Sequence, residues 1–144
     1  MLPSEFKINS DSSILFFINF ALIKFFTVRK VFLLNSCSTC QRIIKEVGID
    51  DSFEMQNIKE KNITAQELEI VKNKVGSYEA LFSRRAMKYR AMGLHEQDLK
   101  EDDFQKLILE EYTFLKRPVI FYDNEIFVGN SKKVVAAAKM AISG

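Results

Sequence analysis

The sequence predicts an α/β domain in which helices flank a central mixed sheet and a helical insert separates the strands into two groups. Three observations predict it. An apolar run is followed by a helical pattern and a second strand pattern, helical pieces come next, and the chain closes with two strand patterns and a last helix. With 144 residues, 47% of them hydrophobic, the chain has room for one domain whose apolar core needs no disulfide staples.

The first unit is a strand, a loop with two cysteines, a helix and a second strand. Residues 31–34 (VFLL) are a short apolar run ended by polar residues, which predicts a buried strand followed by a turn. Apolar residues then recur at helical spacing from Ser38 until Gly48, a residue typical of helix ends. Residues 53–58 alternate apolar and polar side chains, which predicts the second strand.

The middle of the chain predicts helices only. Thr64 and Glu67 have the spacing of a capping box, and the helix that they begin is predicted to run to Gly76. Residues 77–93 indicate a turn followed by short helical pieces. These segments form the predicted insert.

The last part of the chain returns to strands. Before these strands, Asp102 or Asp103 can cap a further helix. Residues 119–122 and 125–128 are rich in β-forming residues, and the Asp-Asn pair between them indicates a hairpin. Ser131 then begins a last helix, so the element order is β-α-β, helical insert, β-β-α.

Residues 1–30 are predicted to be an N-terminal apolar extension of a domain formed by residues 31–144. Residues 13–28 are apolar but interrupted by Lys24, and they are shorter than the about 20 apolar residues of a spanning helix. They also lack the flanks of a signal peptide. Three interpretations stay open: a helix packed on the domain, a membrane-associating segment, or upstream sequence included by too early a start.

Charge and cysteine content narrow the class of function. The formal net charge is +2, and residues 31–144 carry 17 basic and 17 acidic residues. A neutral domain gives no electrostatic reason to expect direct nucleic-acid binding. Two cysteines three positions apart indicate redox or metal chemistry in a reducing compartment, so we expect a cytoplasmic protein. A zinc site is not expected, because four ligands are needed and only His95 could join the cysteines.

Cys37 is the candidate nucleophile. It lies in the loop just before the first helix, where free N–H groups and the helix dipole stabilise a thiolate. In such Cys-x-x-Cys settings the thiol pKa falls from about 8.5 to roughly 3.5–7.5. Cys40, one turn later, can close a disulfide with Cys37 or release a mixed disulfide from it. The alternative is that both residues are buried apolar thiols without a chemical role.

Two arginine-containing pairs are candidates for binding an anion. Arg117 precedes Pro118 at the start of a predicted strand, a place where the X-Pro bond can be cis. A guanidinium held there is a fixed cation for an oxyanion or a thiolate, although a surface salt bridge explains it equally well. Arg84 and Arg85 form the second pair, which taken alone is more typical of a solvated face.

Three ordered motifs resemble a known family: VFLLNSCSTCQRI, the YRAMGL segment that ends at Leu94, and LKRPVIFYDNEIFVGNS. Together they are similar to the glutaredoxin-coupled arsenate reductases of the ArsC type, and the cysteine loop is equally similar to the Spx branch of that family. The resemblance covers residues 31–142. It implies a thioredoxin-like fold with a helical insert.

The resemblance also implies roles for individual residues. The family's nucleophile falls on Cys37, and its Arg-Pro motif falls on Arg117, which would bind the oxyanion, and Pro118, which would be cis. A further arginine of the insert falls on Arg85 or Arg84.

The sequence departs from the arsenate reductase pattern at two places. The place of a third arginine, after the hairpin, holds Asn130, and the second cysteine, Cys40, is a feature of Spx. The first hypothesis is therefore a cytoplasmic thiol–disulfide oxidoreductase that acts on a small oxyanion or disulfide, uses glutathione, glutaredoxin or thioredoxin as its reductant, and needs no bound cofactor. The alternative is an Spx-like regulator that binds RNA polymerase through a Cys37–Cys40 switch. A third interpretation is a family member that acts only as a binding module.

Overall fold

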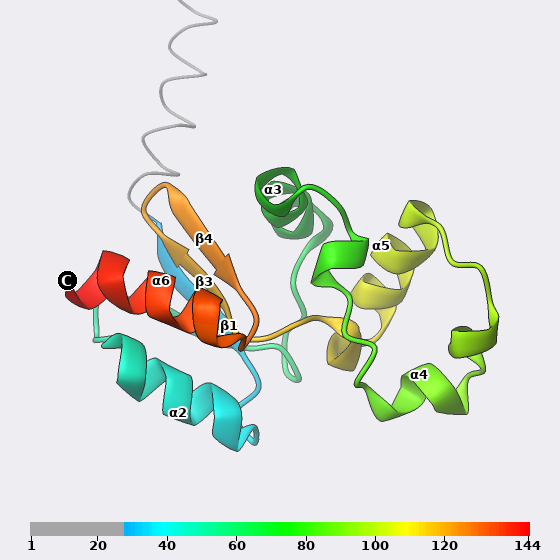
Figure 1. The fold of residues 1–144 in the computed structure, drawn as a ribbon, viewed down its shortest axis with the longest axis horizontal. Coiled ribbons are helices and arrows are strands. Elements are labelled where there is room, and N and C mark those ends of the chain that lie inside the picture. The colour runs from blue at the N-terminus through cyan, green and yellow to red at the C-terminus, as the bar shows by residue number, and fades with distance from the viewer. Residues whose placement is uncertain (1–27) are drawn as a thin grey trace, which may run out of the picture.

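The computed structural model describes residues 28–144 and shows a four-stranded mixed sheet with helices on both faces and a helical insert to one side (Figure 1). The strand order is β2-β1-β3-β4. β1 pairs with β2 in parallel and with β3 antiparallel, and β3 pairs antiparallel with β4. The predicted fold class, an α/β fold with a central mixed sheet, is confirmed.

The strands and helices follow the predicted order. They are β1 (Arg29–Leu33), α2 (Ser38–Val47), β2 (Glu54–Asn57), α3 (Ala65–Val75), α4 (Met87–Ala91), α5 (Glu101–Glu110), β3 (Val119–Tyr122), β4 (Glu125–Val128) and α6 (Lys132–Ser143). Three single 3₁₀ turns, η1 (Glu79–Leu81), η2 (Leu94–Glu96) and η3 (Tyr112–Phe114), connect the helices of the insert. The capping box of Thr64 and Glu67 is present at α3, and Ser131 caps α6.

Two boundaries differ from the predictions. β1 begins at Arg29, earlier than the predicted Val31, because the charged side chains at its start find partners: Arg29 pairs with Asp123 at 3.4 Å and Lys30 pairs with Glu67 at 2.9 Å. The predicted cap of α5 by Asp102 or Asp103 is wrong. Lys100 occupies that position, and the Asp103 side chain accepts a hydrogen bond from the Lys100 N–H at 2.8 Å.

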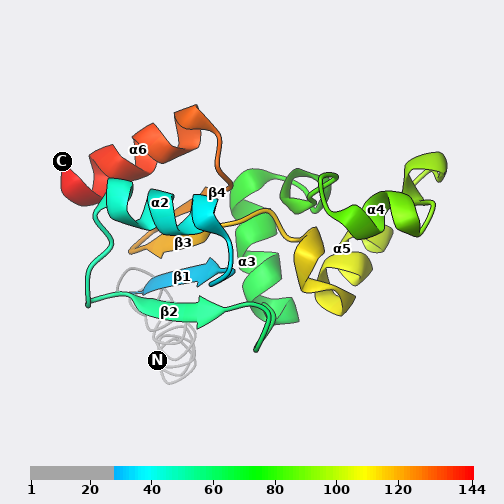
Figure 2. The same ribbon diagram turned by 90° about the horizontal axis from the view of Figure 1, so that it is seen from below.

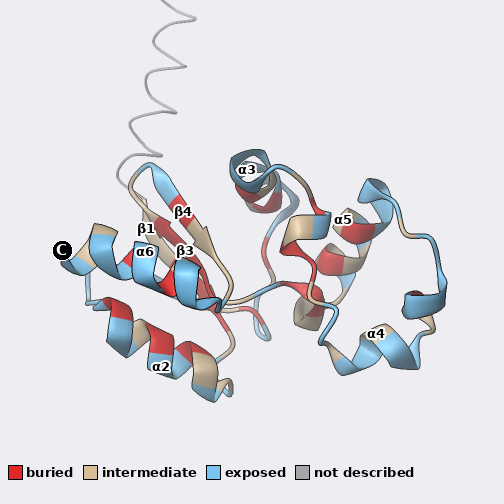
Figure 3. Cartoon of the chain, viewed as in Figure 1, coloured by how far each residue is buried: buried red, intermediate tan, exposed pale blue. Residues whose placement is uncertain are grey.

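Alternation along the strands divides the core into two layers, and Figure 2 shows α2 and α6 together on one side of the sheet. Val31 and Leu33 of β1 pack with Ile120 of β3 against α2 and α6 on one face of the sheet. Phe32, which points to the other face, packs in a larger cluster that includes α3, the 3₁₀ turns and α5. The burial pattern in Figure 3 shows that α2, α3 and α5 each bury one side, whereas α4 buries no residue.

α2 and α6 cover the same face of the sheet and run in the same direction, so that both begin at the side of the molecule that faces the insert (Figure 1). The turn after β1 leads directly into α2, and the turn after β4 leads directly into α6. This arrangement places Cys37 and Ser131, the residues that precede the two helices, on the same side of the sheet as the start of the insert.

Our interpretations of residues 1–27 lie outside the described residues. Within residues 28–144, no helix combines the length and the apolar character needed to cross a membrane.

Candidate functional site

Cys37 is the residue that caps the N-terminus of α2. Its backbone is extended, with φ −88° and ψ 111°, and its Sγ accepts a hydrogen bond from the Cys40 N–H at 3.5 Å. Partial burial raises the pKa of Cys37, but hydrogen bonds from Cys40 and from the Thr39 N–H, together with the charge of Arg117, lower it more. The net result is a pKa below the ordinary thiol value, as the sequence predicted for this position.

Cys40 is in a different environment although it is only one helical turn away. It is fully buried in the core layer between the sheet and the helices α2 and α6. This burial, with the neighbouring Cys37 sulfur as a smaller cause, raises the pKa of Cys40 to about 11. Cys37 is therefore the more acidic of the two thiols, and Cys40 keeps its proton at neutral pH.

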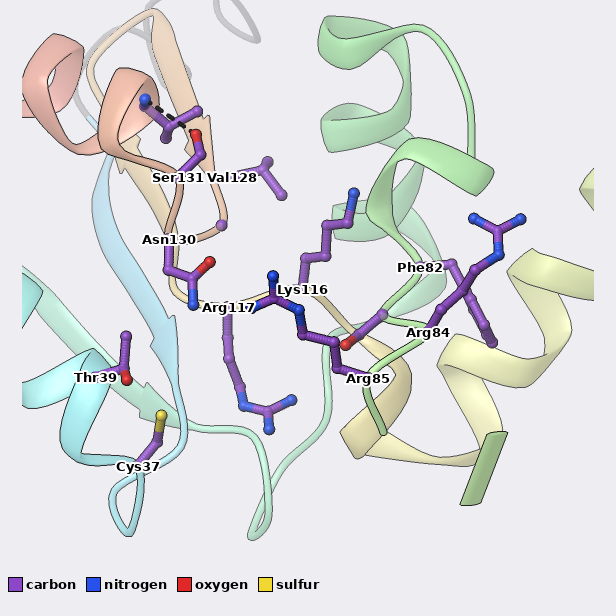
Figure 4. Close-up of a pocket in the computed structure, with 13 residues that line it drawn as sticks. Cys37, Thr39, Phe82, Arg84, Arg85, Lys116, Arg117, Val128, Asn130 and Ser131 are labelled. Carbon is purple, nitrogen blue, oxygen red and sulfur yellow. Dashed lines mark hydrogen bonds between the residues drawn. The ribbon is translucent and has the colours of Figure 1, made fainter. Parts of the chain in front are cut away.

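Cys37 opens onto a cavity of about 620 Å³ between the sheet and the insert (Figure 4). The cavity lies where the first residues of α2, the turns after β4, and the segments around residues 84 and 117 meet. Its lining residues are Cys37, Thr39, Phe82, Ser83, Arg84, Arg85, Lys116, Arg117, Val128, Gly129, Asn130, Ser131 and Val134. Four of these residues are basic and none is acidic, so the cavity favours an anion.

Backbone pairing brings the basic residues at positions 84–85 and 116–117 together. Phe82 and Leu115 form an isolated antiparallel bridge, in which the Ser83 N–H donates to Phe114 O at 2.7 Å and the Lys116 N–H donates to Leu81 O at 2.8 Å. The two segments run in opposite directions through this bridge, and the residues that follow it on each segment, 84–85 and 116–117, all line the cavity. Residues about thirty positions apart thus meet at one wall of the cavity.

Arg117 is held in place by the backbone of its own segment. Its Nη1 donates to the carbonyl oxygens of Thr113 and Leu115, both at 3.2 Å. Its guanidinium points toward the Cys37 side of the cavity (Figure 4), which accounts for its effect on the pKa of Cys37. The bond between Arg117 and Pro118 is cis, as expected, and Pro118 is buried beneath the cavity wall without lining it.

Arg84 and Arg85, between which the sequence left the register open, point in different directions. The Arg84 guanidinium pairs with Glu79 at 2.9 Å and lies over the Phe104 ring, 5.5 Å from its centroid. Arg85 instead reaches across the cavity toward Asn130 (Figure 4). Arg85 is therefore the arginine of this pair that is available to a ligand, although both residues line the cavity.

Sequence reasoning missed Lys116. This residue lines the cavity beside Arg117, and the only signal for it was its place next to the Arg-Pro motif. Asn130, at the place of the third arginine of arsenate reductases, lines the cavity as a neutral amide. Ser131 lines it too, with its hydroxyl engaged as the cap of α6 by the Val134 N–H at 3.2 Å.

The cavity combines a cysteine with basic side chains, which is the set of groups that thiol chemistry on an anion needs. Among residues 28–144, no three His, Cys, Asp or Glu side chains gather as metal ligands would. An ionised sulfur at a helix N-terminus can attack an electrophilic sulfur or an oxyanion's central atom, and neighbouring guanidinium groups can stabilise the negative charge on the substrate.

Comparison with solved structures shows the same fold in several proteins. The YffB (PA3664) protein aligns with a TM-score of 0.64 and 20% identity over 77% of this chain and 98% of its own. The arsenate reductase from Vibrio cholerae aligns with a TM-score of 0.62 and 16% identity over 77% and 98%. An arsenate reductase (ArsC) related protein from Brucella melitensis aligns with a TM-score of 0.57 and 20% identity over 76% and 92%.

These similarities confirm the thioredoxin-like fold that the sequence motifs implied. No curated protein matches the sequence. The model of the ArsC family, however, matches residues 32–138, which include the cysteine loop, the insert and the Arg-Pro motif. The chain therefore belongs to the ArsC family, a family of thiol oxidoreductases.

Proposed function

We propose that the protein is a cytoplasmic thiol-dependent oxidoreductase in which Cys37 is the nucleophile and Arg117 and Arg85 bind an oxyanion. The observation that carries this proposal is the position of the Cys37 sulfur. It lies at the start of α2, its pKa is lowered, and it faces Arg117 in a cavity lined by four basic residues and no acidic one.

Arsenate is the first oxyanion to test. The Cys37 thiolate would form an S–As bond while one arsenic-bound oxygen leaves as water, and Arg117 and Arg85 would hold the remaining oxygens. A second thiol would then attack the Cys37 sulfur, form a disulfide with it, and leave the electron pair of the S–As bond on arsenic, which departs as arsenite. A further thiol would reduce that disulfide and restore Cys37.

The burial of Cys40 favours an external thiol as the group that attacks the Cys37 adduct. A thiol with a pKa of about 11 has little thiolate at neutral pH, and Cys40 does not line the cavity. Glutathione, glutaredoxin and thioredoxin are the candidate reductants, and no bound cofactor is required for the reaction.

The test is arsenate-dependent oxidation of glutathione, alone and with glutaredoxin or thioredoxin, by the wild type and two matched variants. We expect Cys37→Ser to lose turnover and Cys40→Ser to keep most of it, because only Cys37 touches the substrate. Turnover that persists without Cys37 would contradict the assignment.

Absence of turnover by the wild type with every donor would remove the enzyme function. In that case the remaining candidate is the Spx-like switch, which the hydrogen bond from Cys40 N to Cys37 Sγ favours because it holds the two cysteines together. Binding to RNA polymerase that differs between the reduced and the oxidised protein would then be the expected result.

A further inference from the structure

The turn that leads into Cys37 is short and lies at the surface. Asn35 and Ser36 are its two exposed residues, between β1 and α2. Within the turn, the Cys37 N–H donates to Leu34 O at 2.9 Å. An exposed turn closed by one backbone hydrogen bond can move easily, and any movement of it displaces the Cys37 sulfur.

Two side-chain amides from other elements hold this turn. The Asn35 N–H donates to Asn57 Oδ1 at 3.3 Å, and the Asn35 carbonyl oxygen accepts from Gln41 Nε2 at 3.3 Å. Asn57 is the last residue of β2 and pairs with Leu33 of β1, so its side chain starts from a fixed point of the sheet. The Gln41 N–H donates to Cys37 O at 3.1 Å, so Gln41 joins both sides of the turn.

The place of this turn matters for one of the interactions that stabilise the Cys37 thiolate. The N–H groups of Thr39 and Cys40 belong to the same helix end as Cys37, so they move with its sulfur. Arg117 belongs to another segment and is held there by carbonyl oxygens of residues 113 and 115. The attraction between Arg117 and the thiolate therefore depends on where the turn places the sulfur, because Coulomb energy falls with distance.

We propose that Asn57 and Gln41 are positioning residues, which bind the two backbone groups of Asn35 and thereby keep the Cys37 sulfur beside Arg117. Amides suit this role because they supply a donor and an acceptor without a charge. A carboxylate at either place would bring a negative charge toward the thiolate and oppose its formation. The inference rests on the proposed function in taking Cys37 as the reacting thiol.

The experiment measures the pH profile of Cys37 alkylation by iodoacetamide in the full-length protein, for the wild type and the double variant Asn57→Ala, Gln41→Met. We expect the profile of the double variant to move to higher pH. Below its midpoint the rate should fall about threefold, near the low end of the effect of one hydrogen bond because both bonds are exposed. The rate at high pH, where the thiol is fully ionised, should not change.

The same two substitutions are then made together with Arg117→Gln. If they act by moving the sulfur relative to Arg117, they should shift the profile less when this guanidinium is absent, as residues that act through one interaction do. An equal shift with and without Arg117 would overturn the inference. So would a double variant whose profile matches that of the wild type.

Gln66→Met, Asn73→Ala is the matched control, because both residues are exposed on α3 and neither lines the cavity. Its profile should match that of the wild type. Far-UV circular dichroism checks that each variant is folded, and the single variants Asn57→Ala and Gln41→Met should each shift the profile in the same direction as the double variant. Alkylation needs no turnover, so a wild-type Cys37 that reacts like a free thiol would instead count against the proposed function.

Discussion

Cys37 and Cys40 show how position within one helical turn decides the chemistry of a side chain. Cys37 precedes α2 and receives N–H groups that no helical carbonyl uses, which favours the thiolate. Cys40, inside the same turn, points into the apolar layer between the sheet and α6, where a charge is costly. Their surroundings therefore lower the pKa of Cys37 and raise the pKa of Cys40 to about 11.

Arg117 is expected to contribute to the ionisation of Cys37. Alkylation of a thiol becomes faster as pH rises through its pKa, so a lowered pKa moves this increase to lower pH. Arg117→Gln removes a positive charge that stabilises the thiolate, so the pKa should rise and the pH profile of Cys37 alkylation should move to higher pH. The profile is measured with iodoacetamide and mass spectrometry, which also reports Cys40 separately.

Lys45→Gln is the control for this prediction, since Lys45 lies in the last turn of α2, far along the helix from Cys37. Its profile should match that of the wild type. An unchanged profile in Arg117→Gln would show that the backbone hydrogen bonds alone set the reactivity of Cys37.

Single residues also mark the limit of what the sequence predicted at the site. Cys37 was identifiable because the local order, strand to loop to helix, gives it a physical role. Arg117 was identifiable because it precedes a proline at the start of a strand, and its role came from the family resemblance. The choice between Arg84 and Arg85 was not, because it depends on the direction in which each leaves the Phe82–Leu115 bridge. Lys116 was missed for the same reason: its place in the cavity wall depends on pairing with a segment about thirty residues away.

Among the elements, the end of α2 and the start of α3 were predicted correctly, whereas the cap of α5 was not. Thr64 and Glu67 at α3, and Gly48 with φ 86° after α2, occupy the places that their chemistry favours. The start of β1 at Arg29 was not predicted, because the partner of Arg29 is Asp123 and lies in the distant hairpin turn. In a sequence, charged residues beside an apolar run indicate the end of a strand, and only their ion-pair partners show that the strand continues through them.

The capping box of α3 gives a prediction for this element. Thr64 Oγ1 accepts from the Glu67 N–H at 3.1 Å, and the Glu67 side chain accepts from the Thr64 N–H at 3.1 Å. Thr64→Ala should lower the free energy of unfolding by about 1 kcal/mol, the usual cost of losing an N-cap side chain. Urea unfolding followed by far-UV circular dichroism measures this loss.

Thr64→Ser keeps the accepting oxygen and should stay close to the wild type in the same assay. Since Thr64 does not line the cavity, the rate of Cys37 alkylation should be unchanged in both variants. A loss as large in Thr64→Ser as in Thr64→Ala would show that the methyl group, and not the cap, stabilises α3.

At the scale of the whole molecule, the larger core cluster joins the sheet to the insert. Phe32 of β1, Leu68 of α3 and Phe104 of α5 all belong to it, together with Phe82 and Phe114 on either side of the bridge. The Phe82 ring stacks on Phe114 at a centroid distance of 4.9 Å and contacts Phe104 at 5.0 Å. The sheet and the insert should therefore unfold as one unit.

Phe114→Ala tests whether the sheet and the insert unfold together. Phe114 is fully buried, so its removal should lower the free energy of unfolding by about 3–5 kcal/mol. Tyrosine fluorescence reports on both the insert and the sheet, since tyrosines lie in both and the chain has no tryptophan. If the two parts unfold together, the midpoints measured by circular dichroism and by tyrosine fluorescence should still coincide.

Met87→Ala is the matched control, since this side chain of the insert is 90% exposed. It should change the free energy of unfolding by no more than about 0.5 kcal/mol. Two separate transitions in the wild type would show instead that the insert unfolds independently of the sheet.

The bridge between Phe82 and Leu115 has a consequence for how the sequences of homologues can diverge. Because this bridge fixes where residues 84–85 and residues 116–117 lie, their spacing does not depend on α4, which buries no residue. We expect homologues to gain or lose residues in α4 while the charges around the sulfur stay where they are. Partner recognition at α4 and reactivity at Cys37 can then be selected separately.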